Sequence, residues 1–303
     1  MNGTLIRRAV FVSVFLAVLS APRASAAARV FLSGTGVDSG DCSDAASPCR
    51  SLQYSIDQAA IGAEVVIVSS GGFGGAMITK SITVNAPTGV IAFVGRTITV
   101  TIGSTDTVTL RGLSMNGAVF GDSYGINFTA GGTLNIENTV ISSFVSVGIR
   151  DYATGSQLWV HNCDVRKSTD GIVVTASSAV IENSRAVENS DAGFYANDSS
   201  KVLIRNSVAQ GNSVGYYANS QAGGSTELIV DSSVATNNGI GLSSLQFNAG
   251  SVATLRASEC VVMNNSSENL KTYNGSFLVS YGGNRVGGAT GGSTGFTGTN
   301  AQQ

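Results

Sequence analysis

The chain has 303 residues, of which only 12% are charged, and its formal net charge is −2. Globular domains ordinarily carry about a quarter of charged residues, and so few cations leave no basic patch of the kind that binds nucleic acid. A hydrophobic content of 43% argues against a disordered chain. The 38 glycines and only 3 prolines favour many short strands joined by tight turns.

The first segment is typical of a secretory signal peptide. Arg7 and Arg8 precede the apolar run Ala9–Leu19, and the small residues Ala24–Ala26 follow. An uncleaved membrane anchor is the weaker interpretation, because a bilayer span needs about 20 apolar residues. We expect residues 1–26 to be removed, which leaves 14 basic and 19 acidic side chains and a net charge of −5. The mature protein is then expected to be secreted or periplasmic, with no transmembrane segment.

Residues 27–63 are expected to form an opening strand and a short capping helix. Leu52, Ile56, Ala59 and Ala63 recur at helical spacing on one face, and Gly62 supplies a stop signal. A capping element is needed because the open end of a stacked solenoid exposes its core and unpaired strand edges.

From about residue 107 the sequence repeats itself every 22 to 26 residues. A Gly-apolar step marks each repeat, at Gly125, Gly148, Gly171, Gly193, Gly215 and Gly241. Between these steps runs an apolar-x-Asn motif that ends at Asn138, Asn162, Asn183 and Asn206. Fixed self-similarity of this length indicates stacked supersecondary units.

Each unit contains strand-like runs of about four residues separated by Gly, Asn and Ser. Helical repeats would need ten or more residues of helical periodicity, leucine is too sparse for leucine-rich repeats, and the Gly-Gly-x-Gly-x-Asp motif of calcium-binding β-rolls does not occur. The sequence therefore predicts an all-β fold, a single-stranded right-handed parallel β-helix solenoid over residues 64–281. Residues 282–303 are rich in Gly and Thr and are expected to form a mostly disordered tail.

Most of residues 29–286 resembles the pectin-lyase-like right-handed β-helix proteins. Arg29–Asp38, Ser47–Ile56 and Gly62–Ile67 are similar to the usual beginning of that family, and Leu110–Met115 is similar to its first regular coil. The resemblance implies a short helix that caps the first coil. The catalytic strings of pectate lyases and polygalacturonases are absent, so standard pectinase chemistry is not expected, and whether the protein is an enzyme stays open.

The position of each remaining candidate residue within the repeat predicts whether its side chain points inward or outward. Asp151 interrupts a column that otherwise points inward, so it must be hydrogen-bonded or the coil distorted. The four aligned asparagines are expected to form a structural ladder of stacked amides. His161 falls on a charged outer column, in which Glu182 and Arg205 are expected to pair across neighbouring coils.

Four cysteines fit an oxidising compartment. Cys42 and Cys49 flank a short loop and are expected to form a disulfide. The repeat phase assigns Cys163 and Cys260 to different columns four coils apart, roughly 19 Å at the strand spacing. That distance exceeds the limit of about 7 Å between the Cα atoms of a disulfide, so both should be free.

The favoured ligand-binding candidates are aromatic and amide side chains expected on one outer face. Tyr195 and Tyr217 should be neighbours, with Asn197 and Asn219 beside them and Tyr152 two coils earlier. Aromatic rings and amides suit sugar rings, although stacked tyrosines also support one another.

A second candidate is catalytic. Arg150, Asp170 and Asp191 fall on successive coils and could bind calcium and an acidic sugar and abstract a proton. Short acidic residues are, however, also common in turns before glycine. No metal cluster or cofactor motif is found in the sequence, so calcium at this one place is the only cofactor considered.

Three functions follow. The chain is expected to be an exported β-helix protein that binds polysaccharide or cell-envelope glycan. The alternatives are a divergent polysaccharide lyase or hydrolase, and a structural or adhesive surface protein.

Overall fold

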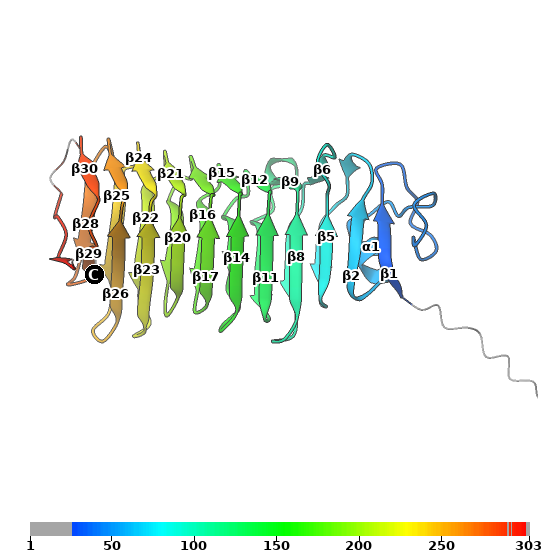
Figure 1. Ribbon diagram of the computed structural model, residues 1–303, viewed down its shortest axis with the longest axis horizontal. Coiled ribbons are helices and arrows are strands. Elements are labelled where there is room, and N and C mark those ends of the chain that lie inside the picture. The colour runs from blue at the N-terminus through cyan, green and yellow to red at the C-terminus, as the bar shows by residue number, and fades with distance from the viewer. Residues whose placement is uncertain (1–25, 290, 292, 301–303) are drawn as a thin grey trace, which may run out of the picture.

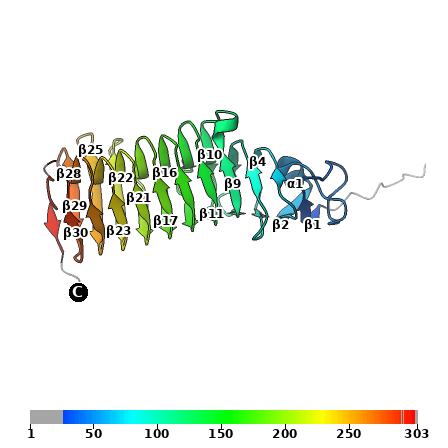
Figure 2. The same cartoon turned by 90° about the horizontal axis from the view of Figure 1, so that it is seen from above.

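The computed structural model describes residues 26–289, 291 and 293–300, and Figures 1 and 2 show them as one elongated stack of parallel strands. The proposed signal peptide lies outside the described residues, apart from Ala26. Each complete coil contributes one strand to each of three sheets, here called sheets A, B and C, in that chain order. Among the described residues no helix combines the length and apolarity that crossing a membrane requires.

All strand pairs in the three sheets are parallel. Sheet A has 12 strands in the order β1 (Ala27–Leu32), β2 (Ala59–Ile67), β5 (Ile82–Asn85), β8 (Thr107–Arg111), β11 (Thr133–Glu137), β14 (Gln157–His161), β17 (Ser178–Glu182), β20 (Lys201–Arg205), β23 (Ser225–Asp231), β26 (Val252–Ser258), β29 (Phe277–Ser280) and β31 (Gly298–Thr299). Sheet B has 10 strands in the order β3 (Gly71–Gly72), β6 (Ala92–Val94), β9 (Leu113–Asn116), β12 (Val140–Ser142), β15 (Asp164–Arg166), β18 (Arg185–Val187), β21 (Val208–Gln210), β24 (Val234–Thr236), β27 (Val261–Met263) and β30 (Arg285–Gly287). Sheet C has 9 strands, which in chain order are β4 (Ala76–Ile78), β7 (Ile98–Thr101), β10 (Tyr124–Ala130), β13 (Val147–Asp151), β16 (Asp170–Thr175), β19 (Ala192–Asn197), β22 (Val214–Ser220), β25 (Ile240–Gln246) and β28 (Glu268–Tyr273).

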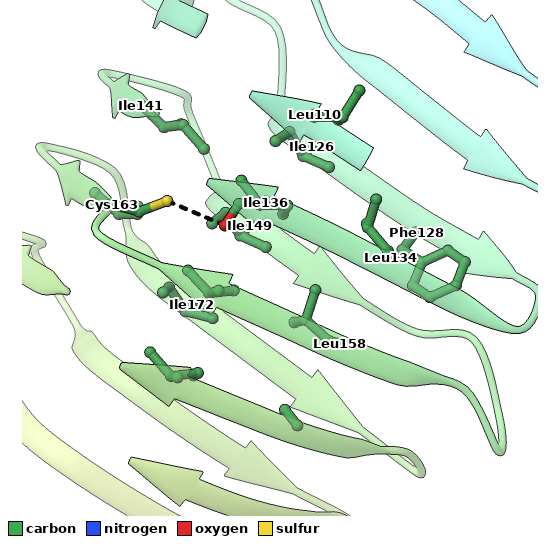
Figure 3. Packing of buried hydrophobic residues seen from close by; sticks show 14 of the residues in the cluster. Leu110, Ile126, Phe128, Leu134, Ile136, Ile141, Ile149, Leu158, Cys163 and Ile172 are labelled. Atoms are coloured by element: carbon green, nitrogen blue, oxygen red, sulfur yellow. Dashed lines mark hydrogen bonds between the residues drawn. The ribbon is translucent and has the colours of Figure 1, made fainter. Parts of the chain in front are cut away.

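The core is built from columns of identical or similar side chains. Strand alternation turns every second residue inward, and Leu110, Ile136 and Val160 meet in register along sheet A. They are at most 1% exposed, and Figure 3 shows Leu110 and Ile136 stacked along the axis. Burying one such side chain contributes about 1.5–3 kcal/mol, so the repeated Val and Ile columns stabilise every coil.

The N-terminal segment differs from the expected helix. Helix α1 covers only Leu52–Gln58, with Ser51 as its N-cap and Leu52 and Ile56 buried. Ala59 and Ala63, expected on the same helical face, lie instead in strand β2. The reason is sheet pairing: β2 lies between β1 and β5, so the hydrogen bonds of a ladder replace those of a longer helix.

The Gly/Thr-rich tail was expected to be mostly disordered, and this is wrong for its described residues. Arg285 N donates to Cys260 O at 2.8 Å and Thr297 N donates to Leu278 O at 2.7 Å. Strands β30 and β31 therefore extend sheets B and A beyond residue 281. Composition misled here because backbone pairing with an existing coil does not need large side chains.

A disulfide joins Cys42 and Cys49, whose Cα atoms are 5.5 Å apart. It closes the loop against β1, because Phe31 N donates to Cys42 O and Cys49 N donates to Phe31 O. Cys163 and Cys260 are buried free thiols.

The expected column for Cys260 is wrong. Arg185 N donates to Cys163 O, and Val261 N and Arg285 N donate to Ser233 O and Cys260 O. Both thiols therefore continue one column of hydroxyl and thiol side chains, Thr139, Cys163, Ser184, Ser207, Ser233 and Cys260, at the turn between sheets A and B. The apolar-x-Asn motif hid this register in the sequence, because the positions equivalent to Asn206 on the next two coils hold Ser232 and Glu259.

The asparagine column also needs correction. Asn138, Asn162, Asn183 and Asn206 are exposed and have φ of about +50°, the left-handed region that asparagine tolerates better than most residues. One amide-to-amide bond is found in this column within the described residues, from Asn162 Nδ2 to Asn138 Oδ1 at 2.8 Å. The column's main role is to make the turn.

A buried asparagine ladder exists at a different position, between sheets B and C. It consists of Asn189, Asn212, Asn238 and Asn265, all at most 4% exposed. Each of the first three amides donates through Nδ2 to Oδ1 of the next asparagine at 3.0 Å. The same Oδ1 accepts the backbone N–H of the preceding asparagine at 2.9–3.0 Å, so the buried amides and these backbone N–H groups satisfy one another.

Asp151 points inward and is fully buried, and hydrogen bonds explain how the core accepts it. Its carboxylate accepts the backbone N–H of Ala153 at 3.0 Å and the hydroxyls of Ser156 and Ser177 at 3.0 and 2.8 Å. Burial nevertheless raises the pKa of Asp151 to about 6.

Candidate functional site

The outer face of sheet C holds the residues expected to bind ligand. Arg150, Val173, Tyr195 and Tyr217 meet in register on four successive coils. Val173 therefore separates Arg150 from the two tyrosines, and the face divides into a tyrosine pair and an arginine cluster.

Tyr195 and Tyr217 form a stacked pair. Their ring centroids lie 4.9 Å apart with an interplanar angle of 25°, and both side chains are half-buried. Burial raises the pKa of both phenols, so each keeps its proton at neutral pH. No hydrogen bond to Tyr217 Oη occurs within the described part of the chain, which leaves this hydroxyl able to bind a ligand.

The two amides near the tyrosines play different roles from those expected. Asn219 Nδ2 donates to Tyr195 Oη at 2.7 Å, and Tyr195 Oη donates to Asn197 Oδ1 at 3.3 Å. Asn197 is half-buried, whereas Asn219 is only 1% exposed. Asn219 therefore holds the Tyr195 hydroxyl in place and offers little surface to a ligand.

Arg150 belongs to an aromatic cluster. Its guanidinium lies over the rings of Tyr124, at 4.9 Å, and Tyr152, at 4.4 Å, and donates to Asn127 Oδ1 at 3.3 Å. Such cation–π contacts hold the cation and both rings together. Tyr152 is 54% exposed, so it presents an open ring face next to a positive charge.

Asp170 and Asp191 do not join Arg150 as expected. Asp170 pairs in register with Val147, three residues before Arg150, and no ion pair links Arg150 to either aspartate among the described residues. The two carboxylates are neighbours. Burial raises the pKa of Asp170 to about 6, and the negative charge of Asp191 adds to this increase. Asp170 Oδ1 accepts the Ala192 N–H at 3.0 Å.

Calcium gains no support from this geometry. Within residues 26–289, 291 and 293–300, no group of three or more His, Cys, Asp or Glu side chains could hold a metal ion. The pair of Asp170 and Asp191 lacks the six to eight oxygen ligands that calcium usually takes.

A second surface, on the outer face of sheet A, was missed in the sequence. Trp159, Val180, Leu203 and Ile229 line a shallow groove of about 300 Å³. The signal was present, because each is the middle residue of three consecutive apolar residues, such as Leu158-Trp159-Val160. Strand alternation turns the middle residue outward when its two neighbours point into the core.

Comparison with known proteins agrees with this architecture. A family model described as "Right handed beta helix region" matches residues 124–290, more than half of the chain. The chain also resembles the crystal structure of pectate lyase Pel9A, with a TM-score of 0.57 and 15% sequence identity over 90% of this chain and 78% of that one. No curated protein matches the chain significantly. The family match, together with three sheets of parallel strands, places this chain in the right-handed β-helix family.

Proposed function

We propose that this protein is an exported β-helix protein that binds polysaccharide on the outer face of sheet C, without standard pectinase chemistry. The observation that carries the proposal is the half-exposed stack of Tyr195 and Tyr217. Sugar rings present apolar C–H faces that pack against aromatic rings, and the Tyr217 hydroxyl can bond a sugar hydroxyl. The arginine cluster around Tyr152 would add a positive charge suited to an acidic sugar.

The solenoid supports an extended ligand better than a compact one. Parallel strands repeat at about 4.8 Å, so equivalent outer positions form a long, straight face along the axis, as Figure 1 shows for the neighbouring sheet. The solved structure that the chain resembles is named a pectate lyase, and the likeness to it concerns the fold.

Binding is tested with the mature protein on a glycan array that includes neutral and uronic-acid polymers. Replacing both Tyr195 and Tyr217 with Ala should lower affinity for the bound glycan at least tenfold, because the stacking surface is lost. Tyr281→Ala is the matched control, since this half-buried tyrosine lies by Arg256 of sheet A. Unchanged binding by the double variant, with unfolding midpoints measured in parallel, would remove this proposal.

A second candidate is glycoside hydrolysis by Asp170 and Asp191. A carboxyl group with a raised pKa beside a second carboxylate is the arrangement that glycosidases use. The test is product formation from the same glycans: Asp170→Asn should abolish it and leave binding intact. If neither the wild type nor the variant releases product, the binding function remains.

Export and the capping helix are parts of the same proposal. Strand β1 begins at Ala27, directly after the proposed cleavage site, and the Cys42–Cys49 disulfide suits an oxidising compartment. Helix α1 packs Leu52 and Ile56 at the N-terminal end of the stack, where an uncovered core needs protection. Mass spectrometry of the exported protein should give an N-terminus at Ala27, whereas retention of residues 1–26 would exclude cleavage there.

A further inference from the structure

The outer face of sheet A carries an apolar stripe whose length is limited to four coils. Trp159, Val180, Leu203 and Ile229 meet in register on β14, β17, β20 and β23. Trp159 is 47% exposed, and the other three side chains are half-exposed. Contiguous exposed apolar side chains on a soluble protein mark an interaction surface.

Polar residues end the stripe on both sides. The same outer column continues as Asn135 on β11 and as Arg256 on β26. A ligand that extended along the whole solenoid would be expected to contact apolar side chains on every coil. Because the apolar residues of this column are confined to four neighbouring coils, the stripe suits an occupant that covers only these coils.

The two columns that flank the stripe are rich in charged side chains. Within the chain, Glu227 pairs with Arg256, and Asp231 accepts the Ser258 hydroxyl at 2.6 Å. Two residues after the stripe lie His161, Glu182, Arg205 and Asp231, one on each coil. Glu182 and Arg205 are neighbours in register, yet no ion pair joins them among the described residues, contrary to expectation. On the other side lie Gln157, Ser178, Lys201 and Glu227, and Lys201 likewise has no ion pair within the described chain.

These residues are self-complementary under one two-fold rotation. Consider an axis parallel to the strands that passes between β17 and β20, so that a second copy faces the first with its coils in reverse order. Val180 then meets Leu203 of the second copy, and Trp159 meets its Ile229. The stripe covers itself completely and leaves no apolar side chain opposite a charge.

The flanking charges agree with the same axis. Glu182 meets Arg205 of the second copy, and His161 meets its Asp231. On the other side Ser178 meets Lys201 and Gln157 meets Glu227, which are hydrogen-bonding pairs. Each pair occurs twice, because a two-fold interface uses the same patch on both subunits.

Two other arrangements of two copies face to face match these residues less well. An axis along the solenoid would set Lys201 against Arg205 of the second copy. A strand-parallel axis moved one coil toward β26 would bring Lys201 to Glu227 and Arg205 to Asp231. The same axis would, however, set the apolar Val180 against the charged Arg256. A like-charge contact disfavours the first arrangement, and burial of a charge against an apolar side chain disfavours the second.

We propose that this stripe is a self-association surface, on which a second copy of the chain binds with its solenoid axis antiparallel to the first. Four coils extend about 14 Å between their outer strands, so the interface is smaller than that of a permanent dimer. The dimer is therefore weak and reversible, with dissociation in the micromolar range.

The test is sedimentation equilibrium of the mature protein from about 1 to 300 μM at moderate salt. The wild type should show a monomer–dimer equilibrium. Glu182→Arg and Arg205→Glu should each weaken dimerisation at least tenfold, because each places like charges together twice. These side chains are on the surface, so unfolding midpoints should stay close to wild type.

Mixing the two single variants provides the decisive measurement. One chain then carries arginine at both of these positions and the other carries glutamate at both, so opposite charges meet at each contact. The mixture should therefore dimerise although neither variant does alone, and the double variant Glu182→Arg/Arg205→Glu should dimerise by itself.

A wild type that stays monomeric at the highest concentration, or a mixture that stays monomeric, would refute the proposal. Glycan binding that Trp159→Ala removes from a monomeric protein would refute it as well. Glycan binding at sheet C should be unaffected by Glu182→Arg, so the two proposals can fail separately.

Discussion

The side-chain amide of Asn212 donates to Oδ1 of Asn238 at 3.0 Å, and Asn238 in turn repeats this contact with Asn265. Both donors also bond a backbone carbonyl of the coil before, Ala186 O and Ala209 O, at 2.9 and 3.0 Å. The ladder thus ties four coils together at a turn that lies between two sheets.

Asn212→Ala should therefore lower the free energy of unfolding by about 1–3 kcal/mol, since it leaves buried donors and acceptors without partners. Urea unfolding followed by circular dichroism measures this. A loss well below this range, under about 0.5 kcal/mol, would mean that water replaces the amide.

Asn183 supplies the comparison, because its amide is exposed and its φ is +50°. Asn183→Gly should change stability by less than about 0.5 kcal/mol, since glycine adopts this conformation freely. Asn183→Ala should cost about 1–2 kcal/mol through backbone strain alone. Equal losses in the two Asn183 variants would instead indicate that the amide itself stabilises the turn.

Burial raises the pKa of the Cys163 thiol to about 12 and that of Cys260 to about 11. Because the thiolate is the reactive form, neither cysteine should react with Ellman's reagent in the folded protein at pH 8. Two thiols per chain should react after unfolding in guanidinium chloride. Rapid labelling of the folded protein would show that the coils around these residues open.

Sequence periodicity was sufficient to predict the parallel solenoid, because inward positions repeat the same apolar residue types in every coil. Gly171, Gly193 and Gly215 are indeed at neighbouring positions, with the Cβ that an Ala would add at Gly171 lying 2.4 Å from Gly193 O. A glycine is needed there because neighbouring coils approach closely.

The buried asparagine ladder escaped detection for a local reason. Asn189 precedes its Gly193 by four residues, whereas Asn212 precedes Gly215 by three, so an alignment anchored on glycine splits the column. Counted from the inward residues Ala186, Ala209, Ala235 and Val262, all four asparagines fall at the third position.

The sequence assigned Arg150 and Asp170 to neighbouring coils, but it could not show the direction of a long side chain. The guanidinium of Arg150 lies over the rings of Tyr124 and Tyr152.

Tyr216 gives a further test of the core. Its ring stacks on Phe194 with centroids 5.0 Å apart, and its hydroxyl donates to Ser207 O at 2.9 Å and lies 3.2 Å from Val234 O. Tyr216→Phe keeps the ring stacking but removes the hydroxyl that contacts the carbonyls of Ser207 and Val234. It should therefore lower the free energy of unfolding by about 1 kcal/mol. Tyr216→Ala should cost about 3–5 kcal/mol by opening a cavity. Equal unfolding energies for the Phe variant and the wild type would mean that the hydroxyl contributes nothing.

Asp151 makes the stability of the fold depend on pH. Its pKa is raised to about 6 by burial, above the ordinary value of 3.8. Between these values the folded protein holds a proton that the unfolded chain has released, so stability decreases as pH rises from about 4 to about 6. Above pH 6 the folded state carries the full cost of a buried carboxylate.

Asp151→Asn should remove this dependence, because a neutral amide resembles the protonated carboxyl and the hydroxyls of Ser156 and Ser177 can reverse their hydrogen bonds. The variant should gain on the order of 1–3 kcal/mol relative to the wild type at pH 7 and little or nothing at pH 4. Asp170, whose pKa is also raised to about 6, contributes a similar slope, so Asp170→Asn serves as the second variant. Urea unfolding at pH 4, 5, 6 and 7 measures the difference between each variant and the wild type. If the advantage of Asp151→Asn were constant across this range, the carboxylate would already be ionised at pH 4 and its three hydrogen bonds would outweigh burial.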